Sequence, residues 1–218
     1  MIYQTAYLSL LIQLVVGIID FLALQIKIPE NKKLFKDLLK MELGVQIIEM
    51  IFYVWMVFNF SNIANITPKR YYDWIITTPT MLITLMAFLD KEHYLGIMDY
   101  ITKNKYDLIK VLSANMMMLL FGLMGELGYI QYQLAIVLGF IPFLYYYNEI
   151  YNKYIKDKEL SLPKKGLFWF FFVVWSLYGI SAFMPYISKN TMYNILDLFA
   201  KNATGLFLAY SIWKLQIK

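Results

Sequence analysis

The sequence predicts an all-α membrane protein, a seven-transmembrane helix bundle with its N-terminus outside. Two observations on composition and one on spacing predict this fold. The chain is 60% hydrophobic, whereas soluble domains are nearer one half. Its charged residues gather in blocks between long apolar runs. Seven runs of about 20 residues, each long enough to cross a hydrocarbon core of roughly 30 Å, use almost the whole chain, so we predict one domain over residues 1–218.

We predict the seven spans at residues 3–26, 38–60, 70–89, 106–127, 129–151, 166–187 and 191–213. The first lacks the basic region and cleavage site of a signal peptide, so we expect a retained helix. Residues 29–40 read PENKKLFKDLLK, with leucines at helical spacing among lysines. This pattern favours equally an interfacial helix on an anionic leaflet and the first turns of the second span.

The lysines predict the orientation, because cytoplasmic loops carry an excess of basic residues. Sixteen of the 20 basic residues lie at the expected cytoplasmic side. They are Lys27, Lys32, Lys33, Lys36, Lys40, Lys91, Lys103, Lys105, Lys110, Lys153, Lys156, Lys158, Lys164, Lys165, Lys214 and Lys218. The other side has Lys69, Arg70 and Lys189. We therefore expect a cytoplasmic C-terminus.

Several classes of function are not expected. The chain has no cysteine, so it carries neither a disulfide framework nor a thiolate metal site. Its one histidine, His93, lies in a charged loop, so we expect no metal. The net charge of +5 is explained by membrane topology rather than by nucleic acid. We expect a lipid bilayer as the surroundings and no enzymatic activity.

Ionisable residues inside the predicted spans carry the functional argument, because such groups are costly in a bilayer and usually pair. They are Glu42, Glu49, Asp73, Asp197 and Lys201, with Arg70 and Glu126 nearer the outer end. Asp197 and Lys201 are four residues apart and share a helix face. The residues alone allow two interpretations. Lys201 belongs to a structural ion-pair cluster, or it forms a Schiff base with an aldehyde and needs carboxylates as counterions.

Four motifs resemble those of the microbial (type 1) rhodopsins. Residues 70–79 read RYYDWIITTP, similar to the RYxDWxxTTP of that family, and residues 196–201 read LDLFAK, similar to its LDxxAK. Residues 175–178, WSLY, resemble its WSxY, and residues 121–126, FGLMGE, are close to the FGxMGE of proteorhodopsins. The motifs occur in the expected order over essentially the whole chain. The compact chain and its lysine-rich connection at 29–40 resemble the viral rhodopsins.

The resemblance implies a cofactor and a set of roles. Retinal, all-trans in the dark, would be bound to Lys201 as a Schiff base. Asp73 would be the counterion and proton acceptor, Asp197 the second carboxylate, Arg70 their support, and Thr77 a hydrogen-bond partner of Asp73. Trp74 and Trp175 would sandwich the polyene. The rest of the pocket would be lined by Thr78, Met81, Met118, Gly122, Gly139, Phe143 and Tyr178.

Departures from the family pattern bear on mechanism. Outward proton pumps of the family carry a carboxylate 11 residues after the counterion, where this chain has Thr84. Residues 184–194, which we expect to include the loop between the last two spans, offer no acidic pair for proton release. A proline and a bulky aromatic of the sixth span are replaced by Gly179 and Ala182, which loosens the ring end of the pocket. Phe183 is a candidate to fill it.

The second span offers a substitute for the missing donor. Glu42, Gln46 and Glu49 share one helix face, and aligning Tyr53 with the family's tyrosine places Glu42 next to Thr84 and Glu49 near the Schiff base. With Ser9 and Asn202 they would line a polar path, and carboxylates along a pore favour cations. This predicts a light-gated cation channel, as in channelrhodopsins and viral rhodopsins.

Two alternatives stay open. In the first, Glu42 is the proton donor of an outward light-driven proton pump. In the second, the chain is a sensory photoreceptor that signals to a partner protein. The channel or the pump would transport monovalent cations or protons. A homo-oligomer is compatible with the sequence, which shows no interface signature.

Overall fold

The computed structural model describes residues 1–59, 65–90 and 94–216, and nearly all of them are helical. Within these ranges six helices are long and apolar enough to cross a membrane. They are α1 (Ile2–Gln25), α2 (Lys33–Asn59), α3 (Thr67–Leu89), α5 (Lys105–Glu126), α6 (Tyr132–Ile150) and α7 (Leu162–Ala182). Lys91, His93 and Lys218, for which the sequence analysis made predictions, lie outside the described residues.

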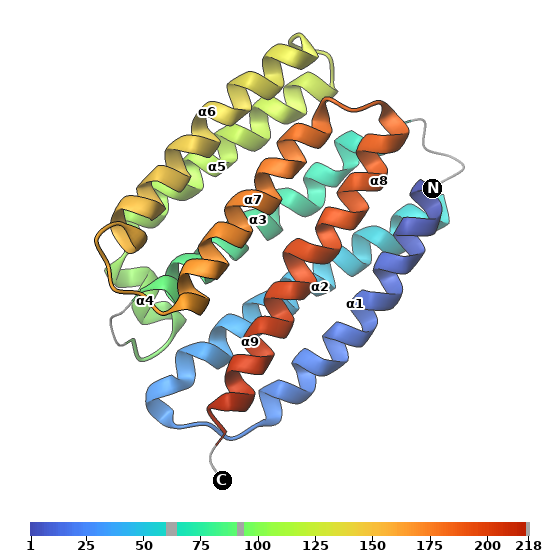
Figure 1. The fold of residues 1–218 in the computed structure, drawn as a ribbon. Helices are drawn as coiled ribbons and strands as arrows, with labels where there is room; N and C mark the ends of the chain where they lie inside the picture. The colour runs from blue at the N-terminus through green and yellow to red at the C-terminus, as the bar shows by residue number, and fades with distance from the viewer. Residues whose placement is uncertain (60–64, 91–93, 217–218) are drawn as a thin grey trace.

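A seventh rod runs the length of the bundle in three parts (Figure 1). Helix α8 (Tyr186–Asp197) continues into a π-helical segment, Leu198–Asn202, and then into α9 (Ala203–Lys214). This rod is not among the six apolar candidates, because α8 buries a row of polar side chains, among them Asn190, Asn194 and Asp197. The two termini lie at opposite ends of the bundle (Figure 1), as an odd number of crossings requires.

The helices form a closed ring in chain order. Each of α1, α2, α3, α5, α6 and α7 packs on the next, and α8 and α9 return to pack on α1. Helices α5 and α6 form a closely packed hairpin at one edge (Figure 1). Helix α9 also contacts α2, so the polar faces of α1, α2 and the last rod meet inside the ring.

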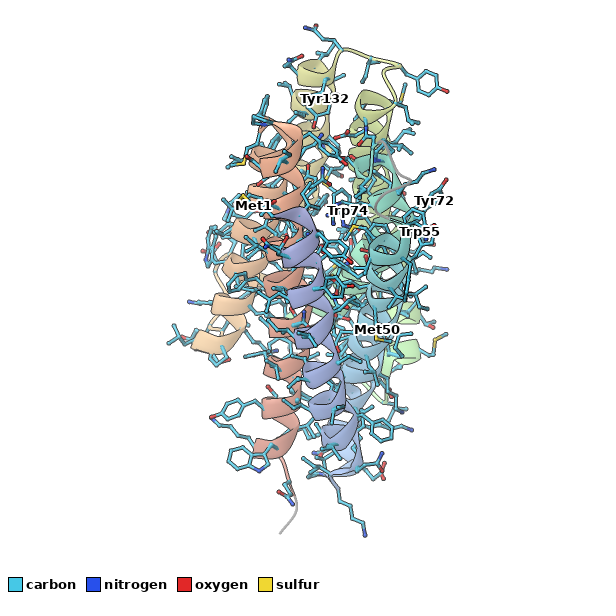
Figure 2. All side chains as sticks on the ribbon, turned by 90° about the vertical axis from the view of Figure 1, so that its right-hand side faces the viewer. Met1, Met50, Trp55, Tyr72, Trp74 and Tyr132 are labelled. Atoms are coloured by element: carbon cyan, nitrogen blue, oxygen red, sulfur yellow. The ribbon has the colours of Figure 1, made fainter. Side chains whose placement is uncertain are left out.

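Several helices expose large apolar side chains and bury polar ones, as expected where the surroundings are lipid. Helix α1 buries Ser9, Gln13 and Asp20. On its outer face, Leu11 is 62% exposed and Ile18 is 61% exposed. Figure 2 shows the same contrast for aromatic side chains, with Tyr72 at the surface and Trp74 directed into the bundle. The chain is therefore an integral, multi-pass membrane protein.

Three boundaries differ from the sequence-based prediction. Helix α2 begins at Lys33 without a break, so residues 29–40 hold the first turns of the second span rather than a separate interfacial helix. Helix α7 ends at Ala182, and Pro185, whose fixed φ suits a helix start, caps α8. Residues 188–190, predicted to lie between the last two spans, are thus helical, and Lys189 and Asn190 are buried.

Two short elements were not predicted. Helix α4 (Ile97–Lys103) connects α3 to α5, and a π-helical turn, Tyr151–Ile155, extends α6. Helix α4 is held to the bundle by the buried Tyr100, whose hydroxyl lies 3.0 Å from that of Tyr154. Both elements lie at the end of the bundle that carries the C-terminus (Figure 1).

Candidate functional site

The charged centre of the bundle lies around Lys201, which the π-helical segment positions. Its Nζ donates a hydrogen bond of 2.6 Å to Asp73 Oδ2 on α3. It also lies 3.7 Å from Glu49 Oε1 on α2 and 3.8 Å from Asp197 Oδ1 on α8. All four side chains are at most 2% exposed. The structure therefore brings together the residues that were predicted to pair, and Glu49 lies beside them, as the alignment on Tyr53 predicted.

The two principal carboxylates have different surroundings. Asp197 accepts hydrogen bonds from Tyr53 (2.7 Å), Tyr178 (2.6 Å) and Arg70 (3.3 Å). Asp73 accepts one bond, from Lys201, and its Oδ1 has no partner among the described residues. Three donors thus fix the position of the Asp197 side chain, and Asp73 is the less firmly held of the two carboxylates.

The predicted bond between Thr77 and the Asp73 carboxylate is corrected by the structure. The Thr77 hydroxyl donates instead to the backbone carbonyl of Asp73, at 3.0 Å. Such i−4 back-bonding is common for threonine inside helices. Thr78 back-bonds to Trp74 in the same way, at 2.9 Å, and also lies 2.9 Å from Asn115 Oδ1 on α5. Thr77 therefore supports the helix that carries Asp73 rather than its carboxylate.

Arg70 closes the side of the centre that faces the chain's N-terminus. Its guanidinium donates to Asn194 Oδ1 at 2.5 Å and to Asn190 Oδ1 at 3.1 Å, in addition to Asp197. Asn190 is bonded in turn to Thr67. Arg70 is fully buried, and only a dense set of acceptors makes such a buried guanidinium tolerable. The sequence reasoning missed both asparagines: Asn190 lay between the last two predicted spans, and Asn194, inside the last one, carries no charge that would have singled it out.

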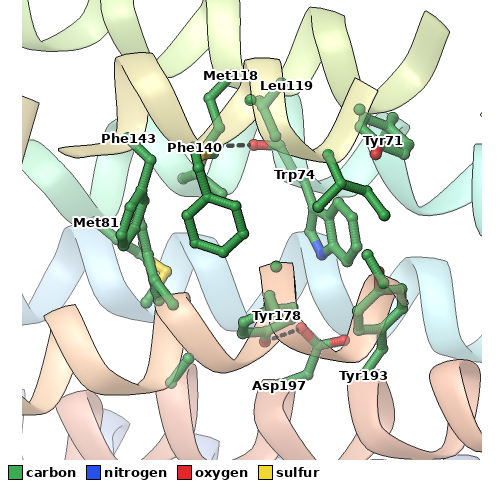
Figure 3. A pocket seen from close by; sticks show the side chains of 18 of the residues that line it. Tyr71, Trp74, Met81, Met118, Leu119, Phe140, Phe143, Tyr178, Tyr193 and Asp197 are labelled. Carbon is green, nitrogen blue, oxygen red and sulfur yellow. Dashed lines mark hydrogen bonds between the residues drawn. The ribbon is translucent and has the colours of Figure 1, made fainter. Parts of the chain in front are cut away.

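An apolar cavity lies between α3, α5, α6, α7 and the last rod (Figure 3), and Lys201 is among the residues that line it. All nine residues that were predicted to line a chromophore pocket line this cavity. Trp74 and Trp175 lie on it, and Asp197 with its Tyr178 bond lies at one end (Figure 3). Further lining residues that the sequence reasoning missed are Tyr71, Leu119, Ala135, Ile136, Phe140, Tyr193 and Ala200.

The loosened ring end of the cavity is occupied differently from the prediction. Phe183, expected to fill the space left by Ala182, is 54% exposed. The ring of Phe140 on α6 projects into the cavity instead (Figure 3). It packs so closely on Gly179 that a Cβ at this position would overlap the ring. The glycine on α7 thus makes room for an aromatic side chain from the neighbouring helix.

A second set of polar groups extends from the centre towards the C-terminal end of the bundle. Glu42, Gln46, Glu49, Ser9 and Asn202 are each at most 3% exposed, and Glu42 lies beside Thr84 as predicted. The structure adds Asp20 of α1, which is fully buried and accepts a 2.6 Å hydrogen bond from Gln46. Asp20 could have been found from sequence, because it is the one carboxylate inside an otherwise uncharged apolar span.

The comparison with known families settles the affiliation. The sequence model of the family described as bacteriorhodopsin-like protein matches residues 2–215. The chain belongs to this family. The family implies a retinal chromophore, and the cavity fits one, since it is apolar along its length and ends at a buried amine. In this rhodopsin the residues of the motifs on α3, α7 and the last rod thus meet around one cavity.

Relatives support the same affiliation. The viral rhodopsin OLPVRII has a similar structure, with a TM-score of 0.83, 26% identity and coverage of 99% of both chains. The proton pumping rhodopsin AR2 from the marine alga Acetabularia acetabulum shares the fold, with a TM-score of 0.76 and 18% identity, over 98% of this chain and 96% of that one.

A green-light absorbing proteorhodopsin from Gamma-proteobacterium EBAC31A08 is 25% identical over 167 residues, which are 70% of this rhodopsin. The chain spans 62% of the length of that relative.

Proposed function

We propose that this rhodopsin is a light-gated cation channel whose path runs between α1, α2 and the last rod. The observation that carries the proposal is a row of buried polar atoms that form no hydrogen bond with any of the described residues. Nine such atoms belong to Gln13, Asp20, Glu42, Gln46, Glu49 and Asn202. Buried polar groups are rarely left without a hydrogen bond. We therefore infer that water molecules bind along this row and form a hydrated path.

The residues of the row fit cations. Asp20, Glu42 and Glu49 supply carboxylates, and the amide oxygens of Gln13, Gln46 and Asn202 are further ligands of the kind that replace a cation's hydration shell. The row begins at Glu49, 3.7 Å from Lys201 Nζ. The change that light causes at Lys201 therefore occurs at the inner end of the path.

The gating chemistry is assigned to the charged centre. Retinal, all-trans in the dark and linked to Lys201, supplies the absorption of light and the change of shape that follows. Asp73 Oδ2, 2.6 Å from Lys201 Nζ, would accept the proton that this nitrogen carries. Neutralising both groups removes the attraction between α3 and the last rod, which shifts the balance between two helix arrangements. Asp197 keeps its bonds to Tyr53 and Tyr178 throughout.

An outward proton pump is the second candidate, and one observation favours it. Both Glu42 oxygens are buried beside Thr84 and have no partner among the described residues. A carboxyl group in this position can hold a proton and release it towards Lys201. A pump requires one such donor, whereas three carboxylates on two helices extend the row here, and this favours the channel.

The current–voltage curve under light separates the two candidates. A channel current changes sign near the Nernst potential of the permeant cation, and this reversal moves when that cation is replaced outside the cell. A pump current stays outward over the physiological range. An outward current at every voltage would overturn the channel proposal. Glu42→Gln would then slow the return to the dark state strongly, because the donor has been removed.

A further inference from the structure

Three helices meet at a narrow polar layer on the C-terminal side of Lys201. Gln46 Nε2 of α2 donates a 2.6 Å hydrogen bond to Asp20 Oδ2 of α1. Gly205 of α9 lies against this bond, and a Cβ at Gly205 would overlap both Asp20 Oδ2 and Gln46 Nε2. Gly205 follows Lys201 by four residues, which is about 6 Å along a helix. We call Asp20, Gln46 and Gly205 the polar layer.

The polar layer interrupts the row of groups that the proposed path uses. Asp20 Oδ1 and Gln46 Oε1 have no partners among the described residues, and both side chains are at most 2% exposed. Glu42 lies close enough to Asp20 for their charges to interact. Between Glu42 and Glu49 the path therefore passes the level at which α1, α2 and α9 meet at the polar layer.

We propose that the hydrogen bond between Asp20 and Gln46, seated on Gly205, is the gate that closes the path in the dark on its C-terminal side. This inference rests on the proposed channel function. The bond occupies Asp20 Oδ2 and Gln46 Nε2, so neither atom can interact with a cation or with the water molecules around it. Gly205 has no side chain, so α9 approaches closely enough for the pair to fill the gap between the three helices.

Opening follows from the position of the polar layer relative to the charged centre. Lys201 and Gly205 belong to one continuous rod, so a displacement of the rod at Lys201 also moves the backbone against which Asp20 and Gln46 pack. Once the bond has broken, Asp20 Oδ2 becomes an oxygen ligand for the cation, beside Gln46 Oε1. Closing requires the bond to form again when the rod returns.

The test measures how fast the photocurrent decays after the light is switched off, and the residual current in the dark. Gln46→Ala and Asp20→Ala each remove one partner, and a buried hydrogen bond to a carboxyl group is strong enough to shift an equilibrium about tenfold. We expect closing to slow about tenfold and a dark current to appear. Asp20→Asn keeps an acceptor for Gln46 and should restore fast closing.

Two glycine substitutions form a matched pair. Gly205→Ala places a methyl group where the bond lies, so closing should slow as in Gln46→Ala. Gly44→Ala on α2 adds the same methyl group, but it meets nothing within 4 Å, so closing should be unchanged. The visible spectrum of each purified variant reports whether it folded and bound retinal. If Gly205→Ala does not fold or bind retinal, the closing rates of Gln46→Ala and Asp20→Asn test the gate instead.

Different outcomes would overturn the channel function and the gate. A wild-type current that never reverses overturns the channel proposal, and the gate with it. A reversing wild-type current combined with normal closing in Gln46→Ala and Asp20→Ala overturns the gate alone. Equal slowing in Asp20→Ala and Asp20→Asn would also overturn it, because the bond would then not be the closing element.

Discussion

At the scale of single residues, the two carboxylates nearest Lys201 are made unequal by their neighbours. Asp197 is held by two tyrosines and an arginine, and Asp73 only by the lysine itself. The motifs of the sequence located both acids and the amine. They did not show which acid is more strongly held, because Tyr53 reaches Asp197 from 144 positions away along the chain.

Lys201→Ala should abolish colour. The substitution removes the buried amine that ends the cavity, so protein incubated with all-trans retinal should show no visible band above that of free retinal. Absorption spectra of purified protein provide the measurement.

Lys189→Ala is the control for this test. Lys189 is also buried, but it pairs with Glu126 at 2.8 Å and does not line the cavity. This variant should therefore remain coloured, although it should lose thermal stability because Glu126 is left without its cation. A visible band in Lys201→Ala equal to that of the wild type would contradict the assignment of the chromophore site.

Asp20 shows what sequence reasoning could have found at this scale and what it could not. A carboxylate in the middle of an apolar span is visible in the sequence, and it indicates a functional site. Its partner Gln46 and the close approach of Gly205 are not visible, since they depend on how α1, α2 and α9 are rotated about their axes. One sequence contains no measurement of such rotations.

At the scale of helices, the hydrophobic runs predicted all seven rods, and proline explains the largest error. The sixth span was extended to residue 187, but α7 ends at Ala182 and Pro185 begins α8. Hydropathy alone did not reveal this turn, because residues 183–187 are largely apolar. Moving the boundary places Asn190 and Asn194 on a helix face that points at Arg70.

The contact between α6 and α7 leads to a prediction about the pocket. Gly179→Ala adds a Cβ that would overlap the Phe140 ring, and the ring already projects into the cavity (Figure 3). The displaced ring should reduce the share of protein that becomes coloured with retinal, by about half or more. Titration of the purified protein with retinal measures this share.

Two variants control this prediction. Gly166→Ala lies on the same helix and meets nothing within 4 Å, so it should bind retinal as the wild type does. Adding Phe140→Leu to Gly179→Ala removes the overlapping ring atoms and should restore colour, which is the coupling expected of residues in contact. Full colour in Gly179→Ala alone would show that the ring has another place to go.

At the scale of the whole molecule, the basic residues predict an orientation that the bundle itself leaves open. We propose that the N-terminus lies outside and the C-terminus in the cytoplasm. On this proposal the turn between α5 and α6 is external, and the turn between α6 and α7 is internal. The absence of cysteine from the chain makes this unusually simple to test.

Single cysteines should be labelled from opposite sides. Tyr129→Cys, at an exposed position between α5 and α6, should react with a membrane-impermeant maleimide in intact cells. Lys158→Cys, exposed between α6 and α7, should react only after the cells are lysed. The wild-type chain, which has no thiol, is the blank. The reverse pattern would mean that the chain is inserted the other way round.

The π-helical segment Leu198–Asn202 has a mechanical consequence for the whole bundle. A π-turn contains one residue more than an α-turn, and one residue corresponds to about 100° of rotation about a helix axis. If this segment rewound into a regular α-helix, α9 would turn by that angle relative to α8. Gly205 would then swing away from α1 and α2, while Asp197, above the turn, stayed where its tyrosines hold it. The π-turn that contains Lys201 is thus enough to let α9 rotate relative to α8.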